Sequence, residues 1–305
     1  MQANEKTNQF EVIIIGGSYA GLSAGLSLGR TLRKVLIIDA GMPCNKQTPY
    51  SHNFLTQDGV CPSDIAALGK AQVAKYGSVS FFNGLALQAQ QQLDKFEITC
   101  DTGVRFYASK LILATGIKDI IPDIKGFPAC WGKSVVHCPY CHGFEFRNKR
   151  AALYSSGEKA MHMASLLSHL NPQLTIIQDG KEAFTDTQMA ALNRQNIEII
   201  NKEVAEFIHQ DGALKTVLFQ DNSQMDFEVL YATLDFVPHS DIAMQLGCDL
   251  YENNHIKIDS FQQTSIPGVY ACGDNSSPMR SVANAVATGN LIGAMVNKAL
   301  TGEVF

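Results

Sequence analysis

The feature that most constrains the fold is a short strand, a glycine-rich turn, a helix and a second strand near the start of the chain. The first run is apolar and β-branched apart from one glutamate, which is typical of a strand buried on both faces of a parallel sheet. The segments are, in order, Phe10–Ile15, Gly16–Gly21, Leu22–Arg30 and Val35–Ile38, followed by Asp39. This order predicts a dinucleotide-binding βαβ unit.

The turn has the composition that a phosphate requires. Glycines let backbone N–H groups approach a pyrophosphate at a helix N-terminus, and a carboxylate such as Asp39 at the end of the second strand can bind a ribose hydroxyl. If Gly16 and Gly21 are the first and third glycines, Ser18 takes the middle position. Its Cβ makes the approach slightly less free. The alternative is a tight strand–helix turn that holds no ligand.

The length of 305 residues corresponds to about two domains. Hydrophobic residues make up 46% and charged residues 17%, so each half can bury a core and global disorder is excluded. Alternation in residues 79–108 predicts an antiparallel meander, and Leu111–Leu113 predicts a strand that Ala114-Thr115-Gly116 closes. Residues 117–136 contain prolines and glycines and suit a connection between domains.

A second α/β unit follows this connection. Its predicted parts are the strand Ala151–Tyr154, the turn Ser155–Gly157, the helix Lys159–Leu170, the strand Leu174–Ile177, and strands at 196–200, 214–220 and 228–233. A second connection is expected at Asp235–Ser240. The chain then ends in a strand at Gly268–Cys272, the pair Gly273-Asp274, and a long helix at Ser281–Leu300.

Charge and end composition exclude several function classes. The net charge is −5 without a basic run, so we expect no nucleic-acid partner. We see no secretory signal pattern, and no apolar run approaches the roughly 18 residues of a membrane span. We therefore expect a cytoplasmic protein without a membrane partner, in which most cysteines are reduced thiols.

The eight cysteines are too sparse for a disulfide scaffold, but one pair is distinctive. The run His137-Cys138-Pro139-Tyr140-Cys141-His142 places two cysteines so that they can close a disulfide if the chain turns there. A helix N-terminus would favour the thiolate, and a flanking histidine can move protons near neutral pH. This pattern favours a redox pair. A structural metal site and a pair of ordinary core cysteines remain the alternatives.

Taken together, these motifs resemble the low-molecular-weight thioredoxin reductase family of FAD flavoproteins, over essentially the whole chain. The resemblance rests on the Gly16–Gly21 turn with Asp39, the Ala114–Gly116 triplet, the cysteine pair, and Gly273-Asp274 followed by Arg280. It implies an α/β fold of two nested Rossmann-like three-layer domains. Residues 1–116 and 245–305 would form a discontinuous FAD domain, and residues 117–244 an NAD(P)-binding-like domain with the cysteines.

The resemblance also implies residue roles. Cys141 would exchange electrons with the flavin, Cys138 would react with an external thiol or disulfide substrate, and Asp274 would hold the ribityl chain or pyrophosphate of FAD. The helix after Arg280 would point its N-terminus at the flavin. The residues expected to bind FAD are Gly16, Gly17, Ser18, Ala20, Gly21, Asp39, Ala114, Thr115, Gly116, Gly273, Asp274, Arg280, Ser281 and Val282.

The sequence departs from the family pattern beside the cysteines. The family has an acid directly after the second cysteine, where this chain has His142. We expect the proton-transfer role to pass to His142, which would titrate nearer neutral pH than a carboxylic acid. The alternative is that His142 only packs or forms a hydrogen bond.

Two further departures affect the nicotinamide nucleotide. The family's Gly-x-Gly-x-x-Ala turn is here Ser155-Ser156-Gly157-Glu158-Lys159-Ala160, so the first glycine is lost and a carboxylate is gained. The arginines that read the 2′-phosphate are replaced by Gln178-Asp179-Gly180-Lys181. A 2′-phosphate requires a cationic partner. We therefore do not expect efficient NADPH use.

The combination is similar to the dithiol oxidase branch of the family, whose members pass electrons from small dithiols through flavin to oxygen. The run His52-Asn53-Phe54-Leu55 with Asp58-Gly59 is also closer to that branch. The substrate would be a small dithiol or disulfide, or a thioredoxin-like protein. Family analogy implies a homodimer. Alternatives are a reductase fed by NAD(P)H or ferredoxin, a non-catalytic flavin redox sensor, and a zinc-binding module.

Overall fold

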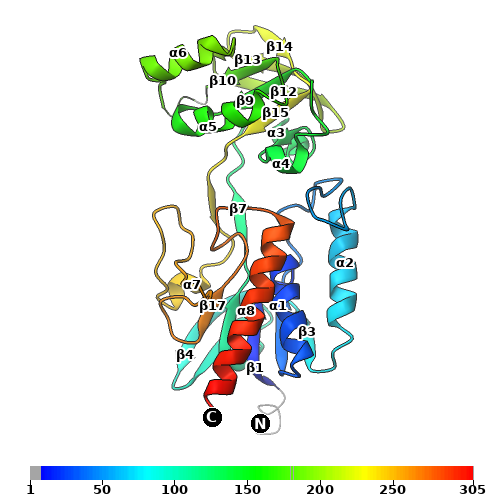
Figure 1. Cartoon of the computed structure of the whole chain (residues 1–305), viewed down its shortest axis with the longest axis vertical. Coiled ribbons are helices and arrows are strands. Elements are labelled where there is room, and N and C mark those ends of the chain that lie inside the picture. Colours follow the sequence, from blue (N-terminus) through cyan, green and yellow to red (C-terminus); the bar gives the residue numbers. More distant parts are fainter. Residues whose placement is uncertain (1–7, 179, 181, 305) are drawn as a thin grey trace. The chain divides into compact units, whose positions relative to one another are not determined.

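The chain divides into two compact units in the computed structural model, which describes residues 8–178, 180 and 182–304. One unit comprises residues 1–46, 54–118 and 236–305, and the other comprises residues 47–53 and 119–235. The second unit ends at residue 235, earlier than residue 244, which the sequence suggested. It also includes residues 47–53, which the sequence did not assign to it. Figure 1 shows both units and labels their elements where space allows.

The first unit is built on a mainly parallel sheet. Its strands are β1 (Gln9–Ile15), β2 (Val35–Asp39), β3 (Val79–Asn83), β4 (Ala86–Gln92), β5 (Lys95–Cys100), β6 (Arg105–Leu113) and β17 (Val269–Ala271). The strand order is β3-β2-β1-β6-β5-β4, and β17 pairs with the end of β6. The predicted meander is correct for β4, β5 and β6, which pair antiparallel. It is wrong for β3, which pairs in parallel with β2.

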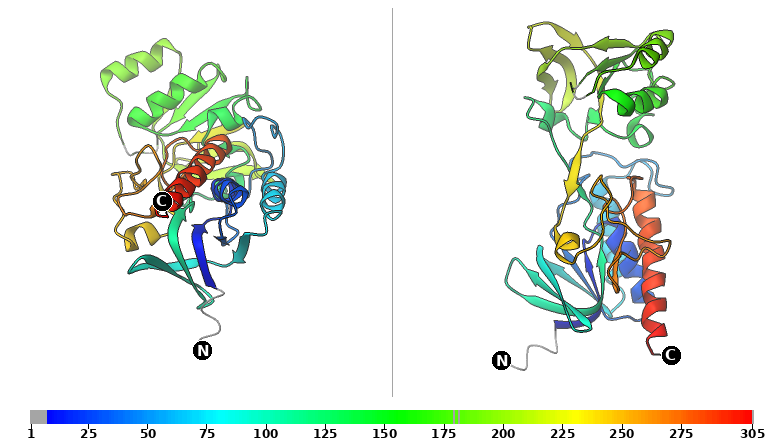
Figure 2. Two further views of the ribbon diagram at one scale, coloured as in Figure 1. Left: turned by 60° about the horizontal axis from the view of Figure 1, so that its bottom comes forward. Right: turned by 90° about the vertical axis from the view of Figure 1, so that its left-hand side faces the viewer.

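Strand alternation in β1 separates two cores in this unit. Val12 and Ile14 pack in the core that includes helices α1 (Tyr19–Arg30) and α8 (Val282–Gly302). Ile13 and Ile15 pack in the core that includes the meander and α7 (Ile242–Gln245). Because successive side chains of a strand point to opposite faces, the sheet is the middle of three layers. Figure 2 shows α1 and α8 side by side against the sheet.

Small residues let α1 and α8 approach closely. A Cβ on Gly289 would overlap the carbonyl oxygen of Ala20, and a Cβ on Gly293 would lie 2.5 Å from the Cβ of Ser27. The hydroxyl of Ser23 also donates to the carbonyl of Val286 at 2.7 Å. The glycines of α8 are therefore required by the packing that holds the N-terminus of α8 beside the start of α1.

The second unit repeats this plan. Its parallel sheet has the order β11-β10-β9-β15-β8, and a separate antiparallel sheet contains β12, β13 and β14. The strands are β8 (Val135–Val136), β9 (Ala151–Tyr154), β10 (Leu174–Ile177), β11 (Glu198–Ile200), β12 (Val204–Gln210), β13 (Ala213–Phe219), β14 (Gln224–Asp226) and β15 (Val229–Ala232). One core contains buried residues of α5 (Gly157–Leu167) and α6 (Asp186–Arg194). The other contains residues of the antiparallel sheet and α3 (Phe127–Cys130).

The remaining elements are α2 (Pro62–Val73), α4 (Pro139–His142), and β7 (Ile117–Asp119), which pairs with β16 (Phe236–Pro238). The predicted α/β class with parallel sheets is confirmed. Helices α2 and α6 and strand β12 were not predicted. The buried residues of α2 are Pro62, Ile65 and Val73, which is too sparse a stripe to indicate a helix by periodicity. Among the described residues, no helix is both long and apolar enough to cross a membrane.

Candidate active site

The glycine-rich turn between β1 and α1 has a backbone that only glycine fits. Gly16 has a φ of +106°, and a Cβ there would overlap the carbonyl oxygen of Ala114. A Cβ on Gly21 would overlap the carbonyl oxygen of Gly16. The amide of Gly17 donates to the carboxylate of Asp39 at 3.1 Å, which joins the turn to the end of β2. The turn therefore packs directly against the backbone at the end of β6 and is joined to the end of β2.

Ser18 is the N-cap of α1, and the helix begins at Tyr19. Within the described part of the chain, the Ser18 side chain makes no capping hydrogen bond to α1. The N–H groups of the first turn of a helix lack partners within the helix, and they carry the positive end of its dipole. The N–H groups at this end of α1 have the geometry and charge that suit a phosphate group.

The Ala114–Gly116 triplet lies at the end of β6, next to the glycine turn. The amide of Ala114 donates to the carbonyl of Ile15 at 2.8 Å. The Thr115 hydroxyl accepts a hydrogen bond from the side-chain amide of Asn275 at 3.1 Å, and the same amide donates to the carbonyl of Leu113 at 2.9 Å. Asn275 is buried and was not predicted. Asn275 belongs to no sequence motif. Its role is to join the ends of two strands that are distant in sequence, and such a contact cannot be read from local spacing.

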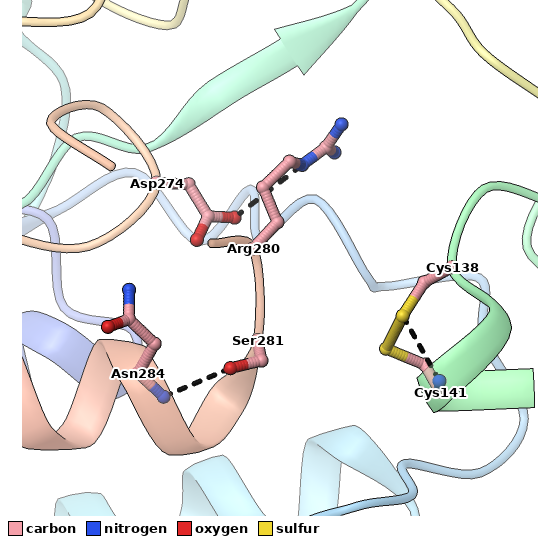
Figure 3. The surroundings of a disulfide bond; sticks show 6 residues. All are labelled: Cys138, Cys141, Asp274, Arg280, Ser281 and Asn284. Atoms are coloured by element: carbon pink, nitrogen blue, oxygen red, sulfur yellow. Dashed lines mark hydrogen bonds and ion pairs between the residues drawn. A yellow bond between two sulfur atoms is a disulfide. The ribbon is translucent and has the colours of Figure 1, made fainter. Parts of the chain in front are cut away.

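The start of α8 lies after the last strand of the same sheet. The amide of Gly273 donates to the Thr288 hydroxyl at 3.2 Å. Ser281 caps α8, because its hydroxyl accepts from the amide of Asn284 at 3.0 Å (Figure 3). Val282 is the first residue of the helix.

Asp274 and Arg280 form an ion pair in the segment before α8. The Arg280 Nε lies 4.0 Å from the Asp274 Oδ2, and the two side chains are 17% and 16% exposed (Figure 3). The thiol of Cys44 lies 4.0 Å from the same carboxylate oxygen. Asp274 thus has its carboxylate fixed where the strand β17 ends.

The residues of the first unit fit FAD. Parallel strands bring their carboxyl ends to one edge of a sheet, where nucleotides bind in this class of fold. Gly16, Thr115 and Asp274 follow the strands β1, β6 and β17 at that edge, and Asp39 is the last residue of β2 there. Two helix N-termini, of α1 and α8, begin there as well. The glycine-rich turn Gly16–Gly21 before α1 can bind a pyrophosphate, and the carboxylate of Asp39 can bind a ribose hydroxyl.

The cysteine pair lies at helix α4 in the second unit. Cys138 is the N-cap of α4, and it forms a disulfide with Cys141 in which the two Cα atoms are 5.3 Å apart (Figure 3). The amide of Cys141 donates to the Cys138 sulfur at 3.1 Å. This hydrogen bond favours negative charge on Cys138 whenever the disulfide is open. Six further cysteines among the described residues form no disulfide.

His142 ends α4 and is half-buried beside the disulfide. Burial, together with a smaller effect of the neighbouring His52, lowers the pKa of His142 to about 4, and Glu145 opposes this shift. The expectation that His142 titrates near neutral pH is therefore wrong. At pH 7 the imidazole is neutral, and a neutral imidazole accepts a proton.

His52 and Glu145 were not predicted to act beside the cysteines. The His52 Nε2 lies 3.7 Å from the Glu145 Oε1. His52 comes from the segment 47–53, which is distant in sequence from α4 but belongs to the same unit. The run that contains His52 was noted only as a family likeness, and this placement could not be derived from sequence spacing.

The nucleotide turn of the second unit differs from that of the first. Ser155 is fully buried, and its hydroxyl lies 2.5 Å from the hydroxyl of Thr233. Gly157 begins α5 with a φ of +55°. In the segment after β10, Asp179 and Lys181 lie outside the described residues, so the expectation about the 2′-phosphate has no structural account.

The described residues contain no group of three or more His, Cys, Asp or Glu side chains that could hold a metal ion.

Comparisons with known proteins agree with this architecture. Residues 10–289 match the pyridine nucleotide-disulphide oxidoreductase family. The thioredoxin reductase tcpT of Claviceps purpurea is 30% identical and covers 98% of this chain and 96% of its own length. A putative thioredoxin reductase TrxB from Bacillus anthracis has a TM-score of 0.92 at 30% identity, covering 97% and 100% of the two chains. An oxidoreductase from Agrobacterium tumefaciens has a TM-score of 0.90 at 33% identity, covering 96% and 99%.

The chain belongs to the pyridine nucleotide-disulphide oxidoreductase family. More narrowly, it is a thioredoxin reductase-like, FAD-dependent oxidoreductase that acts on sulfur groups. The predicted family, fold class and FAD cofactor are confirmed.

Proposed function

We propose that the protein is a dithiol oxidase, in which a dithiol substrate reduces the Cys138–Cys141 disulfide and the electrons leave through FAD. The observation that carries this proposal is the disulfide at the start of α4, which joins Cys138 to Cys141 and is followed directly by His142. A thiol attacks a disulfide as its thiolate, so thiol oxidation requires a proton acceptor. The imidazole of His142, directly after Cys141, is neutral at pH 7 and can receive that proton before it passes to solvent.

Cys138, Cys141 and His142 then have separate roles. A substrate thiolate attacks the Cys138 sulfur, which forms a mixed disulfide and releases Cys141 as a thiolate. The second substrate thiolate attacks the substrate sulfur of that mixed disulfide, which releases Cys138 and leaves the substrate as a disulfide. His142 accepts a proton from a substrate thiol. The substrate loses two electrons and two protons. The cysteine pair gains both electrons, His142 takes one proton, and the released Cys141 thiolate takes the other.

The first unit would hold the cofactor that reoxidises the pair. When bound, FAD supplies a two-electron acceptor for the cysteine dithiol and a route for those electrons to oxygen. The pyrophosphate would lie at the N-terminus of α1, and the segment around Asp274 and Arg280 would hold the ribityl chain. The N-terminus of α8 offers the positive end of its dipole to developing negative charge. We propose that FAD also contacts the other residues that the family resemblance implies, which are Gly16, Gly17, Ser18, Ala20, Gly21, Asp39, Ala114, Thr115, Gly116, Gly273, Ser281 and Val282.

The second unit would not hold a nicotinamide nucleotide efficiently. Its turn has Ser155 where the family has its first glycine, and Glu158 brings negative charge to the first turn of α5. This supports a thiol as the electron donor. The substrate would be a small dithiol.

The second candidate is a reductase of a thioredoxin-like protein, driven by NAD(P)H or another donor such as ferredoxin. The fungal and bacterial relatives favour it, since they are named thioredoxin reductases. In this case the same cysteines act in the opposite direction, and Cys138 attacks the disulfide of the substrate.

We further propose a cytoplasmic homodimer. In the described part of the chain, the six cysteines other than Cys138 and Cys141 form no disulfide, as expected in a reducing compartment. The dimer rests on likeness to the family, and light scattering of the purified protein tests it.

An anaerobic titration at the flavin absorbance separates the two functions. Dithiothreitol is the dithiol probe, and NADPH and NADH are the competing donors. We expect dithiothreitol to bleach the flavin of the wild type within the turnover time, and neither nucleotide to do so. The control is the Cys138→Ser variant, which leaves the residues proposed to bind FAD unchanged. Its flavin should stay oxidised, and therefore yellow, when dithiothreitol is added. Bleaching by NADPH alone would establish the reductase instead.

A further inference from the structure

The N-terminus of α5 in the second unit is the place where a nicotinamide nucleotide would present its pyrophosphate. In a dinucleotide-binding unit this group lies against the turn between the first strand and the helix. Here that turn runs from β9 through Ser156 to the buried Gly157. The turn needs open space over Gly157, since a glycine serves there to let the phosphate approach the backbone.

That space is filled by a side chain of the same chain. A Cβ built on Gly157 would overlap a carboxylate oxygen of Glu182, and it would lie 2.9 Å from both Cβ and Cδ of that residue. Glu182 belongs to the segment after β10 that returns to α5. Its carboxylate therefore lies over the glycine, at the positive end of the helix dipole.

Two hydrogen bonds to the backbone of Glu182 fix the point from which its exposed side chain extends. The amide of Glu182 donates to the Ser156 hydroxyl at 3.2 Å, and the side-chain amide of Gln178 donates to the Glu182 carbonyl at 3.5 Å. Ser156 is the N-cap of α5, but in the described structure its hydroxyl makes no capping hydrogen bond to the helix. The hydroxyl instead connects the turn to the segment that carries Glu182.

A second contact ties the same segment to α5. The side-chain amide of Gln188 donates to the Glu158 carboxylate at 2.6 Å, while the Gln188 oxygen accepts from the amide of Thr185 at 2.9 Å. Thr185 and Gln188 form a capping box at the start of α6. The nearby Lys159 lies 3.0 Å from Asp235, so its charge is already matched. The carboxylates of Glu158 and Glu182 therefore both lie at the first turn of α5.

We propose that Glu182 is the residue that excludes nicotinamide nucleotides, because its carboxylate takes the place of their pyrophosphate over Gly157. This inference deepens the proposed function and rests on it for the statement that a thiol is the electron donor. Glu182 satisfies the helix dipole as a phosphate would, and it repels a second anion. The exclusion is thereby built into the fold and does not depend only on a missing glycine or arginine.

Binding of NADPH and of NADH to the FAD-loaded protein, measured by calorimetry, tests the proposal. Glu182→Ala removes both the charge and the volume, and Glu182→Gln removes the charge alone. Glu203→Ala is the matched control, because it removes an exposed carboxylate elsewhere in the same unit. We expect Glu182→Ala to bind both nucleotides at least about tenfold more tightly than the wild type, Glu182→Gln to gain less, and the control to gain nothing.

The outcome separates this inference from the proposed function. Thiol-driven flavin bleaching should be unchanged in Glu182→Ala, because Glu182 has no part in the cysteine chemistry. If Glu182→Ala and Glu182→Gln keep the wild-type thermal stability but gain no nucleotide affinity, Glu182 is not the excluding residue, and the dithiol oxidase proposal is untouched. If dithiothreitol fails to bleach any variant while Glu182→Ala gains affinity, the proposed function fails and the role of Glu182 stands.

Discussion

The backbone amide of Cys141 points at the sulfur of Cys138 across the first turn of α4, at 3.1 Å. Within a disulfide this contact joins a donor to a weak acceptor. Once the disulfide is reduced, the same amide faces a thiolate, which is a stronger acceptor. The geometry therefore selects Cys138 as the cysteine whose negative charge is stabilised.

The first prediction concerns the acidity of Cys138. In the Cys141→Ser variant, we expect the Cys138 pKa to lie at least about one unit below the ordinary thiol value of about 8.5, because the amide at position 141 remains in place. The rate of alkylation by iodoacetamide as a function of pH, read at the Cys138 peptide by mass spectrometry, measures it. The same variant unfolded in urea is the control. Equal pKa values in the folded and unfolded protein would show that the amide has no effect.

His142 is predicted to be a base throughout the physiological range. Because burial lowers the pKa of His142 to about 4, its neutral form dominates above that pH. We expect His142→Gln to lower the rate of disulfide reduction by dithiothreitol about a hundredfold, which is the scale of general base catalysis. Stopped-flow absorbance at several pH values measures this rate. An acidic limb near pH 6.5 that disappears in His142→Gln would contradict the lowered pKa.

The same pKa predicts how stability depends on pH. An unfolded histidine titrates near 6.5, whereas folded His142 titrates near 4. Between these values the unfolded state binds more protons, so the free energy of unfolding falls as pH drops from about 6.5 to about 4. Burial also lowers the pKa of His239 and His255, which add to this slope. Urea unfolding at pH 7.5 and 4.5 measures the loss. His142→Gln should make it smaller, and an unchanged loss would exclude His142 as a contributor.

The sequence predicted the parts of the fold that follow from local pattern. Buried β-branched runs and glycine turns marked β1, β2, β9 and β10 because a parallel strand is apolar on both faces. Helix α2 was missed because its buried residues are too sparse to set a helical period, and strand β12 because its buried residues, Val204 and Phe207, do not alternate with a period of two. The sequence predicted that β3 pairs antiparallel within the meander, whereas it pairs in parallel with β2. Alternation along a strand does not encode its partner, because strand pairing is a tertiary property.

Candidate site residues follow the same division. The cysteine pair and the glycine turn are contiguous motifs whose chemistry is evident from spacing. Asn275, His52 and Glu182 act on residues that are distant in sequence, and each is an ordinary polar residue in its own segment. The pKa of His142 could not be predicted either, because it depends on burial and on the neighbouring His52.

The last prediction concerns the glycine-rich turn Gly16–Gly21, which we propose binds the pyrophosphate of FAD. Gly16→Ala places a methyl group against the Ala114 carbonyl at a φ of +106°, so the turn must shift. We expect FAD affinity to fall at least about tenfold and the protein to purify with little flavin, because the N–H groups of the turn lose their alignment with the pyrophosphate. The ratio of flavin to protein absorbance measures occupancy, and titration with FAD measures affinity. Gly77→Ala is the matched control, since a Cβ at Gly77 has nothing within 4 Å. If Gly16→Ala retained flavin as Gly77→Ala does, the pyrophosphate would have to lie elsewhere than over this turn.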